Sequence, residues 1–426
     1  MVPDTLASFV TALCVKGTKD TAGVPSNMAK ACPTPRPFRA VAGTVVYLTV
    51  LFFLTFLGRL ILSPLIPAIG EDIELTSGQA GSIFFVGSFG VLAGSIAAGL
   101  VSSRLNHRRT ILVSLFGMAV VLAVVSLADS VWALRAAMIV MGFFAGLHLP
   151  SSLATITATV REQDWPRALS IQQLGPPLGL VAAPLVAVAL SHWFSWQTTF
   201  LWVAGLVLVL DLGFLLFFGG IGAFPGDPPS PGYLRPLART RSFWLMILLF
   251  AFGMGAQVGV YTMLPLYLSQ ERDMTVSAAN TLLGLANIPP LLMVFVSGYV
   301  TARIGPKRTM AIFLLLTGIA AILVGSLSGA GLTVAIFLLP AFAVCFFPPA
   351  FSALSRIVQP TMRSLAAALG PSTAFIIGGG LLPQALGYMG QAYSFSLGII
   401  ITGVVIAVGS SAALLLYLLK ELEPGC

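Results

Sequence analysis

Residues 99–109 read Gly-Leu-Val-Ser-Ser-Arg-Leu-Asn-His-Arg-Arg, and residues 298–308 read Gly-Tyr-Val-Thr-Ala-Arg-Ile-Gly-Pro-Lys-Arg. The glycine and the basic positions of the two stretches match at a constant offset of 199 residues. The same offset relates Thr76 to Thr275, each placed where a long apolar run begins. A register kept over this distance indicates that the chain consists of two similar halves.

The composition around these stretches excludes most classes of protein. The chain has 426 residues, of which 57% are hydrophobic and only 8% are charged, and its mean hydropathy is +0.98. Soluble domains carry roughly 25% charged residues, because their surface must face water. We therefore exclude a soluble enzyme, a disulfide-rich secreted domain and a disordered chain. The composition predicts an all-α membrane protein that crosses the membrane many times.

Twelve apolar runs are long enough to cross about 30 Å of hydrocarbon, for which a helix needs roughly 20 residues. Six runs fall in each half, so we predict two six-helix bundles related by pseudo-symmetry. The runs cover residues 42–69, 78–101, 109–128, 132–158, 168–191, 197–219, 243–268, 277–301, 309–328, 332–357, 365–388 and 394–418.

The spans divide the chain into five parts. Met28 opens a conventional short lead into the first span, so residues 1–27 are either a true tail or the product of a start-site error. The region after the sixth span is rich in Gly and Pro and is the longest internal connection. The predicted parts are a cytoplasmic tail at 1–41, a bundle at 42–219, a cytoplasmic linker at 220–241, a second bundle at 242–419 and a cytoplasmic tail at 420–426.

The basic residues predict the orientation of the chain. Lys and Arg number 22 against 14 Asp and Glu, a net charge of +8. Nineteen of the 22 fall in the tails, loops and helix ends of one side, and only Arg135 and Arg272 fall on the other. Since basic loops stay in the cytoplasm, both termini should be cytoplasmic, in a bacterial inner membrane. The excess of basic residues therefore points to membrane lipids and not to nucleic acid.

The repeated loop carries a family resemblance. In the major facilitator superfamily this loop reads Gly-x-x-x-Asp-Arg-x-Gly-Arg-Arg, and the chain resembles that family from about residue 42 to residue 418. The glycine suits close helix contact, and Asn106 or Gly305 suits a tight turn with positive φ. The resemblance implies a gating loop, formed here by Gly99, Arg104, Arg108 and Arg109 and by Gly298, Arg303, Lys307 and Arg308.

The acidic position of this loop departs from the family pattern. It is Ser103 in the first copy and Ala302 in the second, and neither forms a charged pair. We expect a weaker cytoplasmic latch or one made of other groups. The alternative is a basic loop that only sets topology. Gly175, Pro176 and Gly179 half-match the fifth-helix pattern of proton-driven drug exporters, which leaves drug efflux open.

Arg59 is the principal candidate for a binding residue. It lies near the middle of the first span, where a charge costs about 3 kcal/mol on insertion scales. Thr55, Arg59 and Ser63 share one stripe of the helix, so we expect Arg59 to face the central cavity. A guanidinium suits a carboxylate or a similar anion. The alternatives are a bond to helix-end carbonyls or a pair with Asp211.

Other polar residues within the spans are weaker candidates. His148 can carry a proton near neutral pH, and Asp211 is a second candidate for a coupling proton. Gln257 and Tyr261 share a face by their spacing, and together with His148 and Asn287 they are candidate substrate-binding residues. The simpler interpretation of each is a hydrogen bond between packed helices.

We therefore predict a secondary transporter that moves a small organic or inorganic anion by alternating access, with the proton as coupling ion, and that functions as a monomer. The rivals are a proton-driven efflux pump for amphipathic compounds and a non-transporting assembly or sensor protein on the same scaffold. No phosphate loop, nucleophile pair or metal-ligand spacing appears in the sequence, and the four cysteines form no CxxC pair. We expect no enzymatic activity, cofactor, metal site or disulfide.

Overall fold

The structure is a computed structural model, and it describes residues 35–226, 234–358 and 363–416. Residues 1–34 of the predicted N-terminal tail, the whole predicted C-terminal tail and the centre of the linker lie outside the described residues. Within the described ranges the chain is almost entirely helical, and its one β-type pairing is an isolated bridge between Arg36 and Val160.

The N-terminal half contains six membrane-long helical runs, two of them interrupted. Its elements are α2 (Phe38–Leu60), α3 (Leu62–Asp72), α4 (Ser77–Leu105), α5 (His107–Val125), α6 (Val131–Thr159), η1 (Glu162–Asp164), α7 (Trp165–Gln172), α8 (Gly175–Ser191) and α9 (Trp196–Phe217). The short helix α10 (Leu234–Ala238) lies in the linker.

The C-terminal half repeats the arrangement with more interruptions. Its elements are α11 (Arg241–Met254), η3 (Gly255–Val260), α12 (Tyr261–Gln270), α13 (Val276–Ala286), α14 (Pro290–Ile304), α15 (Pro306–Ser326), α16 (Gly329–Val344), α17 (Phe347–Ile357), α18 (Arg363–Phe375), η5 (Ile376–Leu381), α19 (Leu382–Ala392), α20 (Phe395–Gly409) and η6 (Ser410–Leu415). The elements η3 and η5 are π-helical turns.

Eleven of the described helical runs are long and apolar enough to cross a membrane. The run Arg363–Ala392, made of α18, η5 and α19, is the twelfth. Large apolar side chains cover the outer faces, as on α9, where Phe217 is 81% exposed and Leu216 is 73% exposed. In a membrane protein lipid covers such a surface. The prediction of twelve membrane helices in two six-helix bundles is confirmed.

Repeated residues mark matching helix ends in the two halves. Thr76 and Thr275 are the N-caps of α4 and α13, and each hydroxyl accepts a hydrogen bond from the third N–H of its helix. Asn106 ends α4 with φ 74°, and Gly305 ends α14 with φ 83°. Glycine adopts this left-handed region freely and asparagine tolerates it. The predicted tight turns are therefore confirmed.

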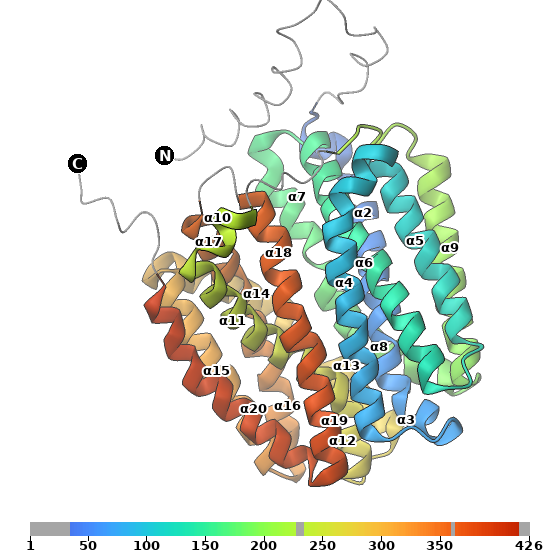
Figure 1. Cartoon of the computed structure of the whole chain (residues 1–426), viewed down its shortest axis with the longest axis vertical. Coiled ribbons are helices and arrows are strands. Elements are labelled where there is room, and N and C mark those ends of the chain that lie inside the picture. The colour runs from blue at the N-terminus through green and yellow to red at the C-terminus, as the bar shows by residue number, and fades with distance from the viewer. Residues whose placement is uncertain (1–34, 227–233, 359–362, 417–426) are drawn as a thin grey trace, which may run out of the picture.

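The two halves lie side by side (Figure 1). Helix α4 of the first half packs along α18, η5 and α19 of the second, while α8 packs on α13 and α3 on α12. The first described helix begins, and the last one ends, at the upper end of the molecule in Figure 1. The repeated motif with its basic residues forms the turns between α4 and α5 and between α14 and α15. We call the end of the molecule where these turns lie the basic end, and the other the opposite end.

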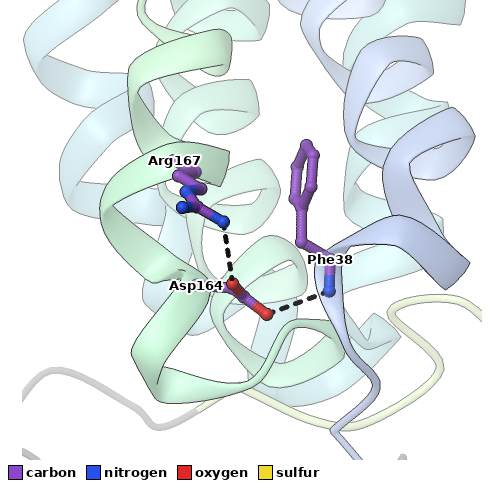
Figure 2. A network of polar contacts seen from close by, with 3 residues as sticks. All are labelled: Phe38, Asp164 and Arg167. Atoms are coloured by element: carbon purple, nitrogen blue, oxygen red, sulfur yellow. Dashed lines mark hydrogen bonds and ion pairs between the residues drawn. The ribbon is translucent and has the colours of Figure 1, made fainter.

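Two segments contact the N-terminal half at the basic end: the residues just before α2 and the start of the linker. Arg36 exchanges backbone hydrogen bonds with Thr159 and Arg161 at 2.9 and 3.0 Å. Asp164 accepts the Phe38 N–H at 3.0 Å and lies 3.8 Å from the Arg167 guanidinium (Figure 2). These contacts fix the chain where α2 begins.

The described start of the linker is held in the same way. Gly222 and Phe224 accept the N–H groups of Arg108 and His107, and Gly226 donates to Ser102. The linker therefore leaves the N-terminal half by way of the repeated loop.

Candidate functional site

A small pocket lies between the two halves, at the level where α2 ends, within the membrane run Phe38–Asp72. Its volume is about 20 Å³, enough for one water molecule and too small for an organic solute. Both halves contribute to its wall, which is made of Arg59, Leu60, Phe84, Gly87, Ser88, Met138 and Gly142 from the first half and Val258, Thr262, Phe375 and Gly379 from the second.

Arg59 supplies the positive charge of this pocket. Its Cζ atom lies over the Phe375 ring at 4.8 Å and over the Phe56 ring at 5.6 Å. Among the described residues the guanidinium has no hydrogen bond and no ion pair. The site therefore holds a positive charge whose N–H donors have no partner in that part of the chain.

Of the predicted stripe Thr55, Arg59 and Ser63 on the run α2–α3, only part faces the second half. Ser63 donates to the Thr262 carbonyl at 3.0 Å, across the contact between α3 and α12. Thr55 instead donates to the carbonyl of Phe52 in its own helix. Arg59 lies on the same helix face as Ser63, and this places its side chain in the pocket between the halves.

The second half forms its wall from two π-helical turns. Val258 belongs to η3, Gly379 belongs to η5, and Phe375 is the last residue before η5. The two turns approach so closely that a Cβ atom on Gly259 would lie 2.2 Å from the Gly378 carbonyl oxygen. Isolated π-turns occur often at functional sites. The glycine run at 378–380 marks this region in the sequence, but periodicity does not reveal the π geometry.

Two polar residues of the second half, the predicted candidate Tyr261 and also Asn280, make hydrogen bonds to the first half. Tyr261 donates to the Leu180 carbonyl at 2.9 Å, from α12 to α8. Asn280 donates to the Pro64 carbonyl at 3.0 Å, from α13 to α3. Neither is among the residues that line the pocket. In this state Tyr261 is an interface residue.

The remaining substrate-binding candidates also lie outside the pocket wall. His148 is completely buried inside the first half, where its Nδ1 atom is 3.2 Å from the Ser114 hydroxyl and its ring stacks on Phe52 at 5.9 Å. Gln257 is half-buried in η3. Asn287 donates to the Leu283 carbonyl of its own helix at 2.8 Å.

Asp211 lies on α9, away from Arg59, and is 5% exposed. Its Oδ1 atom is buried without a hydrogen-bond partner among the described residues. Tyr47 of α2 donates to the carbonyl of the adjacent Leu210 at 2.7 Å. The acid therefore sits at a contact between α2 and α9 within the first half.

The repeated loops are held within their own halves. Asn106 accepts the Arg109 N–H at 2.9 Å, and the Arg108 guanidinium donates to the Leu215 carbonyl at 2.8 Å. In the second copy, Arg303 lies over the ring of Tyr299 at 4.9 Å. Arg104 and Arg303 occupy the last turns of α4 and α14, where a cation is favoured by the helix dipole.

The expectation for the motif glycine is wrong for the second copy. We expected this glycine to permit close helix contact, but a Cβ atom on Gly298 would meet nothing within 4 Å. The helix α14 has few buried residues in this state, and no described residue packs against that position.

Comparison with known proteins agrees with this architecture. A family model described as "Major Facilitator Superfamily" matches residues 48–290 and again residues 262–425. A solved structure of a bacterial homolog to the human lysosomal transporter Spinster, in inward-facing and occupied conformation, aligns with a TM-score of 0.77 at 16% identity. The alignment covers 92% of this chain and 100% of that one.

Two curated relatives match part of the chain. The multidrug efflux pump LfrA of Mycolicibacterium smegmatis is 29% identical over 236 residues, which are 55% of this chain and 43% of the pump. The 3-(3-hydroxy-phenyl)propionate transporter of Escherichia coli is 26% identical over 227 residues, which are 51% of this chain and 54% of that protein. The chain thus spans about half the length of these two relatives.

Proposed function

Because the chain belongs to the major facilitator superfamily, we propose that it is a secondary active transporter that moves a small anion by alternating access. The two bundles, which we place at residues 42–219 and 242–419, rock about the pocket between them. The observation that carries the proposal is Arg59, a guanidinium inside the membrane-spanning region that lies over two aromatic rings and has no hydrogen-bond partner among the described residues.

The energetics of Arg59 favour an anionic solute. A charged side chain near the bilayer centre costs about 3 kcal/mol on insertion scales, and such residues mark substrate pathways. The planar guanidinium offers a fork of donors that matches a carboxylate. A relative named as a 3-(3-hydroxy-phenyl)propionate transporter carries a carboxylate by that name, which supports an organic anion.

The contacts between the halves support alternating access. Ser63, Tyr261 and Asn280 make hydrogen bonds across the halves on α3, α12 and α13. Those elements lie toward the opposite end, and the pocket between the halves has a volume of only about 20 Å³. Solute entry therefore requires the halves to separate at the basic end. We place this end in the cytoplasm of a bacterium, with the repeated loops as its gate.

We propose a proton as the coupling ion, with His148 and Asp211 as its candidate carriers. Each has a buried polar atom without a partner among the described residues, His148 Nε2 and Asp211 Oδ1. A carrier variant, His148→Gln or Asp211→Asn, loses uptake driven by a pH gradient but keeps exchange of labelled for unlabelled solute. If both variants retain gradient-driven uptake, neither residue carries the proton.

A thermal-shift screen of the purified protein tests the anion site. A ligand at about 100 times its dissociation constant stabilises the folded state by about 2.7 kcal/mol. We expect one class of small anions to stabilise the wild type and not Arg59→Gln.

Arg135→Gln is the matched control for that screen. Like Arg59, Arg135 lies on a membrane helix and over an aromatic ring, that of Trp132 at 4.5 Å. Unlike Arg59, it donates hydrogen bonds to the Ser82 hydroxyl and lies outside the pocket. The control should keep the anion response. An anion response that survives Arg59→Gln overturns the site.

Efflux of amphipathic compounds is the second candidate function. A wider groove of about 590 Å³ runs between α2 and α8, with a wall that is apolar except for the Thr49 hydroxyl and that includes Phe53, Val181 and Leu185. A relative is named as a multidrug efflux pump. Stabilisation of both wild type and Arg59→Gln by lipophilic compounds alone would favour this function.

A further inference from the structure

The charge of the pocket sets a limit on its solute. Arg59 is the one ionisable side chain in the wall. A second negative charge on the solute would enter the membrane interior without a partner, at a cost of several kcal/mol. The wall therefore suits a single negative charge.

The hydroxyls of the wall are already used. Ser88 donates to the Phe85 carbonyl at 2.6 Å, and Thr262 donates to the Gly259 carbonyl at 2.9 Å. Each hydroxyl has one proton to donate. A polyhydroxylated solute would find few free donors here, and each of its unpaired hydroxyls would lower affinity. Apart from Arg59, the larger side chains of the wall are apolar: Leu60, Phe84, Met138, Val258 and Phe375.

Two aromatic rings lie next to the Arg59 guanidinium, one from each half of the protein. Its Cζ atom is 5.6 Å from the centroid of the Phe56 ring and 4.8 Å from that of the Phe375 ring. All five N–H groups of a guanidinium lie in its plane, and its faces can pack on aromatic rings. Of the two contacts, the one with Phe375 depends on the second half being in place.

From these observations we infer that the pocket selects a small monocarboxylate with an apolar, ring-sized body, and that Phe375 is the positioning residue that holds Arg59 for it. This inference rests on the proposed transport of an anion. The carboxylate binds the guanidinium edge, and the body packs against Phe84, Met138 and Phe375. The pocket must widen to admit it, and the two π-turns of the wall, η3 and η5, are the elements with an irregular backbone.

Equilibrium titration of the purified full chain with three probes tests the substrate class. Benzoate has one charge and an apolar ring, gluconate has one charge and a hydroxylated body, and succinate has two charges. We expect benzoate to bind at least about tenfold more tightly than gluconate or succinate, a difference of 1.4 kcal/mol. Tighter Arg59-dependent binding of gluconate or succinate overturns this inference and leaves the proposed function intact. If no anion binds in an Arg59-dependent way, both fail.

Phe375 is tested in the same titration. Phe375→Leu should weaken benzoate binding about three- to tenfold, the range of a partly buried cation–π contact. Phe375→Tyr keeps the ring and should restore affinity to within about twofold, which a purely structural role does not predict. Phe295→Leu is the matched control, because Phe295 is 69% exposed on α14 and lies outside the pocket. Unchanged benzoate affinity in Phe375→Leu overturns the positioning role.

Discussion

Arg59 shows how much of the site can be inferred from a single residue. Its position in an apolar run and its helical phase with Ser63 were enough to predict that it faces the central cavity. In the structure Arg59 lines the pocket between the halves and lies over the rings of Phe56 and Phe375. Phe375 was not predictable, because it lies 316 residues away and no periodicity relates it to Arg59. Contacts between distant spans depend on how the bundles dock.

The polar candidates show the opposite case. The sequence identifies His148, Gln257, Tyr261 and Asn287 as polar groups inside spans, but their type does not say which face is the cavity. In the structure Tyr261 donates to a carbonyl of a packed helix, the simpler of the two roles considered for it, whereas Asn287 donates to a carbonyl of its own helix. A buried polar group needs a partner wherever it lies, so polarity alone does not locate a site.

At the residue scale we predict a stability cost for Asn106→Ala. The residue holds φ at 74° and its side chain caps α5 by accepting the Arg109 N–H. Alanine loses the cap and is strained at that angle, so unfolding in detergent should become easier by about 1–3 kcal/mol. Asn106→Gly keeps the backbone conformation and should lose less. Equal melting temperatures for Asn106→Ala and the wild type would contradict this interpretation.

At the element scale, the sequence predicts where the membrane helices begin and end, but it does not predict the irregular turns inside them. The twelve runs agree with the structure because length and apolarity are what a bilayer requires. Thr76 and Thr275 were placed correctly because N-caps have a local chemical signature. The π-turns η3 and η5 were missed, since one extra residue per turn leaves the hydrophobic pattern nearly unchanged.

The contact between the two π-turns gives the second prediction. In Gly259→Ala the new methyl group would lie 2.2 Å from the Gly378 carbonyl oxygen. The helices must move apart, which should cost about 1–3 kcal/mol of stability. Thermal unfolding in detergent measures this cost.

Gly298→Ala is the matched control for that substitution. A Cβ atom there meets nothing within 4 Å, and alanine is favoured over glycine in a helix by about 1 kcal/mol. We expect unchanged or slightly higher stability, although Gly298 belongs to the repeated motif. A large loss in Gly298→Ala, or none in Gly259→Ala, would contradict the packing described here.

At the scale of the whole molecule, the two halves are joined by the packing of α4 on α18, η5 and α19, of α8 on α13 and of α3 on α12, together with a few hydrogen bonds and the contact between Arg59 and Phe375. The paired halves were predictable from the offset of 199 residues, because a repeated sequence folds into a repeated structure. The conformational state was not predictable from the sequence, since in alternating access the same two halves adopt several relative arrangements. The hydrogen bonds through Ser63, Tyr261 and Asn280 define the state seen here.

The contact between α4 and α18 gives the third prediction. The hydroxyls of Ser95 and Ser372 are 3.1 Å apart across the two halves, so cysteines at the same positions would bring two thiols into contact, and an oxidant can cross-link them. In a background without the native cysteines, oxidised Ser95→Cys/Ser372→Cys should lose transport and recover it on reduction. Each single cysteine variant is the control. Full transport by the cross-linked protein would show that this contact does not open.

Counterflow in proteoliposomes tests the central claim most directly, because it needs no knowledge of the coupling ion. Vesicles loaded with unlabelled benzoate are diluted into labelled benzoate at mildly alkaline pH, beside protein-free vesicles that report passive leak. We predict transient accumulation of label with the wild type and with Arg135→Gln, and leak alone with Arg59→Gln. Accumulation by Arg59→Gln equal to that of the wild type would contradict an anion site at Arg59.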